Sequence, residues 1–226
     1  MKHIIFFLVG IISLFLIPEH SFSQTKVNDS SVSGLPLQTE YSKRNAMGAD
    51  ILVSTNGFGL GTFFRHEYSP DFAGFIDFSV SESKDDQEFE SYNPYTGQTF
   101  VVGKINRFLV MPLYVGVQYR LFSEDIVDNF RPYVNGAVGP TIVYVFPYNE
   151  EYFTALGKGQ PKYTVGGYLG FGAFFGSERS SLFGLNVRYY FVPYTGGLPS
   201  MYHGSDIASK TDFGGLFISF SIGSAW

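Results

Sequence analysis

The stretch from Asn106 to Phe122 reads NRFLVMPLYVGVQYRLF, and two kinds of side chain alternate along it. One set is entirely apolar or aromatic and comprises Leu109, Met111, Leu113, Val115, Val117, Tyr119 and Leu121. The other set comprises Tyr114, Gly116, Gln118 and Arg120. Because successive side chains of a β-strand point to opposite faces of its sheet, this alternation predicts a strand with one apolar and one polar face.

The same alternation returns in other parts of the chain, at residues 58–67, 76–81, 131–146, 163–175, 182–192 and 215–226. A single segment of this kind is weak evidence, since half-buried strands of soluble sandwiches look similar. Asn56-Gly57 is a strong hairpin signal, so Ala49 to Thr55 is predicted to form a separate first strand. The number of predicted strands is then about eight. One long first strand, with a different total, is the alternative.

The predicted connections differ in length in a regular order. Those at residues 69–71, 123–129 and 177–181 are short, and those at 84–104, 147–162 and 196–212 are long and polar. Short and long connections alternate, as periplasmic turns and external loops do in outer-membrane barrels.

The composition suits strands that face lipid on one side. The chain has 25 Phe, 16 Tyr and 26 Gly, and only 15% of its residues are charged, against roughly 25% in an ordinary soluble domain. Mean hydropathy is only +0.06, too low for a bundle of membrane helices. Strands with one lipid-facing and one polar face combine these properties.

Several classes of site are excluded or disfavoured. The absence of cysteine excludes disulfides, thiolate metal sites and a cysteine nucleophile. A formal net charge of −5 disfavours nucleic-acid binding, which needs a basic surface. The four histidines, His3, His20, His66 and His203, are widely separated, so neither a metal site nor a cofactor is predicted.

The first residues have the pattern of an export signal. Met1-Lys2-His3 is a basic start, an apolar run follows to Ile17, and Ser21-Phe22-Ser23 supplies small residues for cleavage. Residues 1–23 are therefore predicted to be a signal peptide, residues 24–47 a flexible periplasmic leader, and residues 48–226 the folded domain. An uncleaved anchor is the alternative, but the run is shorter than the roughly 20 residues a spanning helix needs.

A sheet that enters a membrane has to close, because every backbone polar group in lipid must be paired. The predicted fold is therefore all-β: a closed, antiparallel, up-and-down transmembrane β-barrel of about eight strands, whose interior is filled by side chains. The polar residues predicted to face that interior are Arg65, Glu67, Asp77, Gln118, Arg120, Asn135, Asn186 and Arg188. The hypothesis is that the three arginines pair with Glu67 and Asp77 in a buried network.

The last strand carries a resemblance to known proteins. The chain ends on Trp226, with Phe220 and Ile222 at alternate positions before it. This ending looks like the assembly signal of bacterial outer-membrane barrels. Residues 48–226, with Arg131-Pro132-Tyr133-Val134 and Gly139-Pro140, resemble the small outer-membrane β-barrel domain family common in Bacteroidota. The resemblance implies a Gram-negative outer membrane, insertion by the barrel-assembly machinery, and contact with membrane lipid and lipopolysaccharide. It implies no catalytic residues.

Three local patterns are candidate sites. His203-Gly204-Ser205 resembles the His-x-Ser spacing of lipid A deacylases, although an ordinary polar loop is the simpler interpretation. His66-Glu67 beside Arg65 is interpreted as a rim ion pair in preference to a proton-transfer pair. The acids near Lys84 to Gly97 either bind a divalent cation or form a solvated loop.

The sequence therefore predicts a barrel that is structural or binds an external ligand through its loops, and is not an enzyme. The alternatives are a narrow channel or transporter for a small solute, a lipid A-modifying enzyme at His203 and Ser205, and a soluble secreted β-sandwich.

Overall fold

The computed structural model describes residues 44–55, 57–84, 90–92, 94–95, 97, 99–101, 103–123, 130–175, 181–199 and 211–226. The chain divides into two units, residues 1–40 and 41–226, and the described residues all belong to the second. The predicted signal peptide, and the predicted leader up to residue 43, lie outside the described residues.

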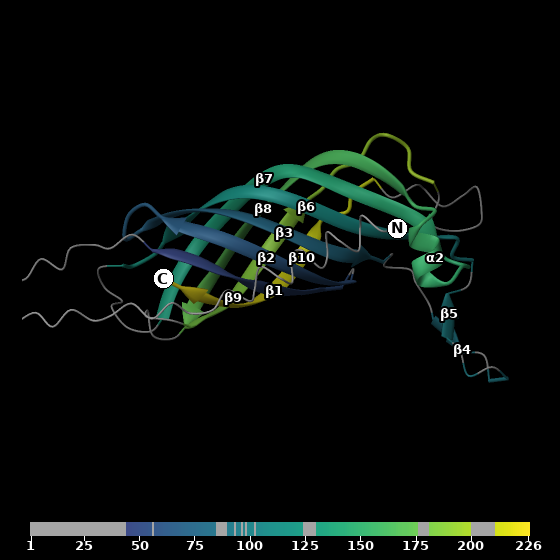
Figure 1. Cartoon of the computed structure of the whole chain (residues 1–226), viewed down its shortest axis with the longest axis horizontal. Helices are drawn as coiled ribbons and strands as arrows, with labels where there is room; N and C mark the ends of the chain where they lie inside the picture. The colour runs from purple at the N-terminus through teal and green to yellow at the C-terminus, as the bar shows by residue number, and fades with distance from the viewer. Residues whose placement is uncertain are drawn as a thin grey trace, which may run out of the picture. The chain divides into compact units, whose positions relative to one another are not determined.

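Among the described residues, eight strands form a closed antiparallel barrel in sequence order (Figure 1). They are β1 (Asn45–Ser54), β2 (Gly57–Glu67), β3 (Phe72–Ser83), β6 (Asn106–Arg120), β7 (Phe130–Pro147), β8 (Gln160–Phe175), β9 (Ser181–Phe191) and β10 (Gly215–Ala225). The last strand pairs with the first, from Ala46 opposite Ala225 to Ser54 opposite Phe217. The predicted fold class is confirmed.

The boundary between the first two strands lies where the Asn-Gly signal predicts it. Ser54 at the end of β1 pairs with Gly57 at the start of β2. Gly57 has a φ of 149°, in the region that favours glycine. β1 begins at Asn45, three residues before the predicted start of the folded domain at Gly48. The backbone N–H of Asn45 donates to the carbonyl of Trp226 at 2.8 Å, and the N–H of Trp226 donates to the carbonyl of Asn45 at 2.9 Å. The pairing between the first and last segments of the barrel therefore reaches Asn45.

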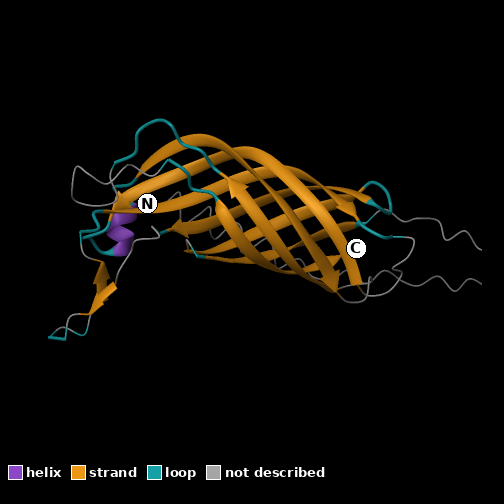
Figure 2. Ribbon diagram, turned by 180° about the vertical axis from the view of Figure 1, so that it is seen from behind, coloured by secondary structure: helices purple, strands orange, loops and turns teal. Residues whose placement is uncertain are grey.

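The two ends of the barrel differ. The short hairpin of β4 (Glu90–Tyr92) and β5 (Thr99–Val101) and the helix α2 (Tyr152–Leu156) lie at the end away from the C-terminus (Figures 1 and 2). We call this the loop end and the other the C-terminal end. Within the described residues, no helix has the length and apolar character needed to cross a membrane.

The helix α2 is tied down at both of its ends. At the first, the carboxylate of Glu151 accepts hydrogen bonds from the backbone N–H and hydroxyl of Thr154, at 3.1 and 2.8 Å. These bonds hold the pKa of Glu151 below its usual value. At the second, the hydroxyl of Tyr144 in β7 donates to the carbonyl of Leu156 at 2.6 Å.

The outer surface of the barrel wall is apolar on every strand. Large apolar side chains there are 39–67% exposed. They include Ile51, Val53, Leu60, Ile76, Leu113, Val115, Val117, Val138, Val165, Leu169, Phe171, Phe183, Leu185, Leu216, Ile218, Phe220 and Ile222. The alternation at residues 131–146 predicts that Phe146 shares the outward face of its strand with Val134 and Val138, but Phe146 is an exception. It is only 1% exposed, because Tyr152 of α2 packs edge-on against its ring, with centroids 5.5 Å apart.

Candidate functional site

Tyrosines from three strands fill the middle of the lumen. The rings of Tyr114 in β6, Tyr168 in β8 and Tyr190 in β9 lie 4.9–6.2 Å apart, centroid to centroid. None of the three is more than 6% exposed. Phe75 stacks against Tyr168 from β3, and Phe217 packs edge-on against Tyr190 from β10. We call Tyr114, Tyr168 and Tyr190 the tyrosine plug. It places large rings across a barrel of a size that side chains are able to fill.

Inward-facing glycines of β8 make room for side chains from the neighbouring strands. A Cβ atom at Gly170 would lie 2.6 Å from Oδ1 of Asn135 and 3.0 Å from Oδ1 of Asn186. A Cβ atom at Gly172 would lie 2.9 Å from the hydroxyl oxygen of Tyr133. Glycine at these positions of β8 therefore leaves space for the larger side chains of Asn135, Asn186 and Tyr133 inside the lumen.

A buried ionic triad lies beside the tyrosine plug. Nη2 of Arg188 in β9 donates to Oδ2 of Asp50 in β1 at 2.8 Å, and Nη1 lies 3.9 Å from Oδ2 of Asp77 in β3. The three residues are 2–7% exposed. We call them the Asp50–Arg188–Asp77 triad. It links three strands that are far apart in the sequence.

Neutral groups supply further hydrogen bonds to the carboxylates of the triad, whereas Nε of Arg188 has no hydrogen-bond partner among the described residues. The hydroxyl of Ser221 donates to Oδ1 of Asp50 at 2.5 Å, and the hydroxyl of Tyr168 donates to Oδ2 of Asp77 at 2.6 Å. The guanidinium of Arg188 also lies 5.0 Å from the centre of the Tyr168 ring. Hydrogen bonds of this kind offset part of the free energy that is lost when buried charges are removed from water. Tyr168 therefore joins the triad to the tyrosine plug.

The predicted lumen residues separate into two groups. Asp77, Asn135, Asn186 and Arg188 are buried in the middle of the barrel. Arg65, Glu67, Gln118 and Arg120 lie nearer the C-terminal end, where Nη2 of Arg65 is 3.4 Å from Oε1 of Glu67. Arg188 thus lies beside Asp77 and Arg65 beside Glu67, and Arg120 lines the same cavity as Arg65 and Glu67.

Sequence reasoning missed Asp50, which makes the shortest ion pair of the triad. No inward and outward faces were assigned to the predicted first strand. The alternation is nevertheless present in the sequence, because the apolar Ile51 and Val53 alternate with Asp50 and Leu52. In the structure Ile51 and Val53 are exposed on the outer surface, and Asp50 and Leu52 are buried. A period of two through these residues places Asp50 inside the barrel.

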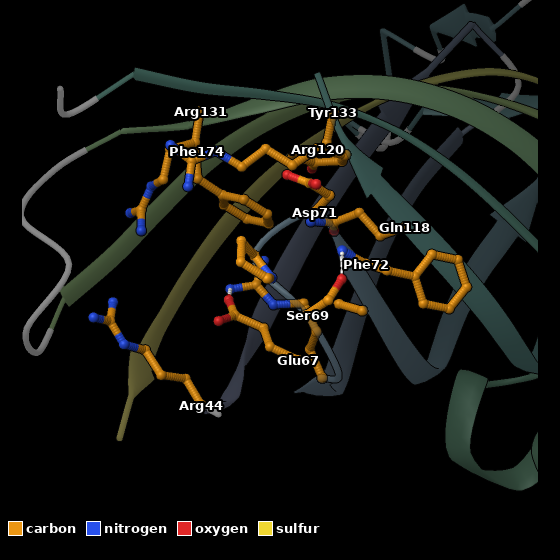
Figure 3. A pocket seen from close by; sticks show the side chains of 13 residues that line it. Arg44, Glu67, Ser69, Asp71, Phe72, Gln118, Arg120, Arg131, Tyr133 and Phe174 are labelled. Carbon is orange, nitrogen blue, oxygen red and sulfur yellow. Dashed lines mark hydrogen bonds and ion pairs between the residues drawn. The ribbon is translucent and has the colours of Figure 1, made fainter. Parts of the chain in front are cut away.

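The space left in the middle of the lumen is small. A cavity of about 20 Å³ lies between Asp77, Asn135, Arg188 and Ser221. This is about the volume that one water molecule needs. A larger cavity, of about 170 Å³, lies at the C-terminal end, and Figure 3 shows the side chains around it.

Four arginines converge on this larger cavity. Arg44 comes from just before β1, Arg120 from the end of β6, and Arg131 from the start of β7 (Figure 3). The fourth, Arg65, comes from β2. The acids of the lining are Glu67 and Asp71, and the remaining wall is formed by Ser69, Pro70, Phe72, Ala73, Gln118, Tyr133 and Phe174. We call this cavity the arginine mouth.

The other candidate residues that the structure describes lie away from the lumen. Phe220, Ile222 and Trp226 are on the outer surface and are 47–61% exposed. Nδ1 of His66 is 2.7 Å from Oδ1 of Asn45. His203 and Ser205 are outside the described residues. Within the part of the chain that the structure describes, no group of three or more His, Asp or Glu residues is arranged to hold a metal ion.

Comparisons with known proteins were made by sequence and by structure. No family model and no curated protein sequence matches the chain. Among solved structures, it is similar to the N-terminal β-barrel domain of Pseudomonas aeruginosa OprF, with 10% identity and a TM-score of 0.45 over 81% of this chain and 97% of that one. Neisserial surface protein A is 10% identical to this chain, with a TM-score of 0.44 over 81% of this chain and 93% of that one. Outer membrane protein AlkL in lipid bilayers is 14% identical, with a TM-score of 0.37 over 88% of this chain and 96% of that one.

Proposed function

We propose that this protein is an integral outer-membrane β-barrel with a filled lumen, which acts structurally or binds a partner through its loop end, without catalysis. The observation that carries the proposal is the inverted distribution of polar and apolar residues. The Asp50–Arg188–Asp77 triad is enclosed within the barrel, while large apolar side chains cover the outside. A barrel in lipid needs this distribution, since its outer wall faces hydrocarbon.

The extent of the apolar surface supports a membrane location over a soluble sandwich. Exposed apolar residues occur on the outer face of every barrel strand. Soluble monomers rarely expose continuous apolar patches beyond a few hundred Å². The pairing of β1 with β10 also leaves the barrel without an open edge, as a sheet in lipid requires.

The orientation follows from the two ends of the barrel. In outer-membrane barrels the short turns lie in the periplasm and the long loops outside. We therefore infer that the C-terminal end faces the periplasm. The predicted signal peptide at residues 1–23 supports export, and Phe220, Ile222 and Trp226 support recognition by the barrel-assembly machinery. The resemblance to the Bacteroidota-type family is part of the same proposal, and it depends on Arg131-Pro132-Tyr133-Val134 and Gly139-Pro140.

Exposed aromatic residues make the loop end the best candidate for partner binding. Tyr95 is 96% exposed and Phe153 is 74% exposed. Aromatic side chains are enriched among the residues that dominate the energy of protein interfaces. Beside Phe153, the guanidinium of Arg107 lies 4.6 Å from the centre of the Tyr148 ring and 5.5 Å from that of Tyr152. These contacts hold α2 against the barrel wall, so the exposed ring of Phe153 is presented from an anchored element.

A narrow channel is the second candidate function. The arginine mouth and the small central cavity share Arg65, Gln118, Tyr133 and Phe174 as lining residues. The two cavities therefore adjoin, and a rearrangement of the triad would extend them toward the loop end.

Conductance in a planar lipid bilayer separates the two candidates. We expect the wild-type protein to give no stable single-channel steps, because the tyrosine plug and the triad occupy the lumen. A variant with Tyr114→Ala, Tyr168→Ala and Tyr190→Ala should conduct, and the loop variant Tyr95→Ala should behave as wild type. Stable steps from the wild-type protein would contradict the filled lumen and support the channel.

A further inference from the structure

The arginine mouth carries an excess of positive charge. Its lining contains four guanidinium groups and two carboxylates, so the formal balance is 4 − 2 = +2. The whole chain, by contrast, has a formal net charge of −5. Clefts that are lined by charges of one sign concentrate ions of the opposite sign. The local charge of the arginine mouth therefore favours an anion.

The type of cation narrows the chemistry of that anion. Every cationic residue in the lining is an arginine. Guanidinium presents several N–H donors in a rigid plane, which matches the paired oxygens of phosphate and carboxylate groups. Lysine would supply charge without this geometry. The lining therefore suits an oxyanion better than a simple halide ion.

The walls of the arginine mouth help to position its arginines. The guanidinium carbon of Arg65 lies 4.5 Å from the centre of the Phe174 ring, and Phe174 itself stacks on Tyr133 with centroids 4.6 Å apart. Arg65 is only 5% exposed. Since charges interact more strongly where water is partly excluded, an anion beside Arg65 is held more tightly than on an open surface.

The size of the cavity fits a small group together with water. Its volume of about 170 Å³ is several times the roughly 30 Å³ that a water molecule occupies in the liquid. Asp71 lies in the β2–β3 turn, where its backbone carbonyl accepts a hydrogen bond from Arg120 N–H at 2.7 Å. The carboxylate of Asp71 therefore sits in the same lining and competes with an incoming anion.

From these observations we infer that the arginine mouth is a binding site for a phosphate or carboxylate group. The site adjoins the small central cavity of the lumen and lies at the opposite end of the barrel from the loop end. In the proposed orientation it opens toward the periplasm. The ligand is either a free anion or an anionic group carried on a larger molecule.

The test is isothermal titration of the full mature chain, folded in a zwitterionic detergent, with sodium phosphate, glycerol 3-phosphate and sodium acetate in turn. Arg131→Gln should weaken binding about tenfold, the effect of losing one charge-assisted hydrogen bond. Asp71→Asn should tighten binding, because it removes a competing negative charge. Arg107→Gln, at the loop end, is the matched control and should leave binding unchanged.

The three titrants separate the sources of the ligand. If inorganic phosphate binds and glycerol 3-phosphate does not, the ligand is a free anion. If the two bind equally, the ligand is a phosphate group on a larger molecule. Tighter binding of acetate identifies a carboxylate. No saturable binding of any titrant, or equal binding by wild type and Arg131→Gln, would overturn the inference. Neither result bears on the filled lumen, which conductance tests separately.

Discussion

Replacing Arg188 with methionine is expected to lower the free energy of unfolding of the barrel by about 3–5 kcal/mol, the usual cost of removing one partner of a buried ion pair. The carboxylates of Asp50 and Asp77 would then remain buried without the cation that lies 2.8 and 3.9 Å from them. The measurement is urea-induced unfolding from lipid vesicles, followed by tryptophan fluorescence. Trp226 is the single tryptophan of the chain and directly follows β10.

Two further variants control this experiment. Asn substitutions at Asp50 and Asp77, combined with Arg188→Met, should recover most of the lost free energy, because no unpaired charge is left inside. Arg131→Met, in the partly open arginine mouth, should cost less than about 1 kcal/mol, as exposed ion pairs do. If Arg188→Met unfolds at the same urea concentration as wild type, the triad does not hold the barrel together.

Replacing Phe220 with arginine is expected to cost about 2–4 kcal/mol, the range for a cation on the lipid face near the bilayer midplane. Phe220 lies in the middle of β10, opposite Ile51 of β1 and Leu185 of β9, and its side chain is 47% exposed. The same urea titration from vesicles measures the change.

The matched control is Tyr95→Arg at the loop end. Its side chain is almost fully exposed, so the change should stay within about 0.5 kcal/mol, as for most surface substitutions. Equal and small effects at both positions would mean that Phe220 faces water. That result would favour a soluble barrel over a membrane protein.

The barrel wall was predictable from sequence because its signal is local. In Asn106–Phe122 the alternation of apolar and polar side chains shows both the strand and the face that points outward. The prediction of inward Tyr114 agrees with the complete burial of its ring. Asn56-Gly57 marked the first hairpin for the same reason, since a two-residue turn needs particular residues at particular positions.

Features that depend on contacts between distant segments were not predictable in this way. The start of β1 at Asn45 depends on pairing with Trp226 at the other end of the chain. The arginine mouth brings together Arg44 from just before β1, Asp71 from the β2–β3 turn and Arg131 from the start of β7, and these segments are far apart in the sequence. The burial of Phe146 depends on α2, a helix of five residues that is too short to leave a periodic signal.

The central claim is that the mature chain forms a closed barrel in the outer membrane. Its most direct test is heat-modifiability of the outer-membrane fraction on a denaturing gel, comparing boiled with unboiled samples. The account predicts that the protein stays with the membrane after carbonate or urea extraction and migrates at a different position when unboiled. Recovery in the soluble periplasmic or secreted fraction, with no shift on boiling, would contradict it.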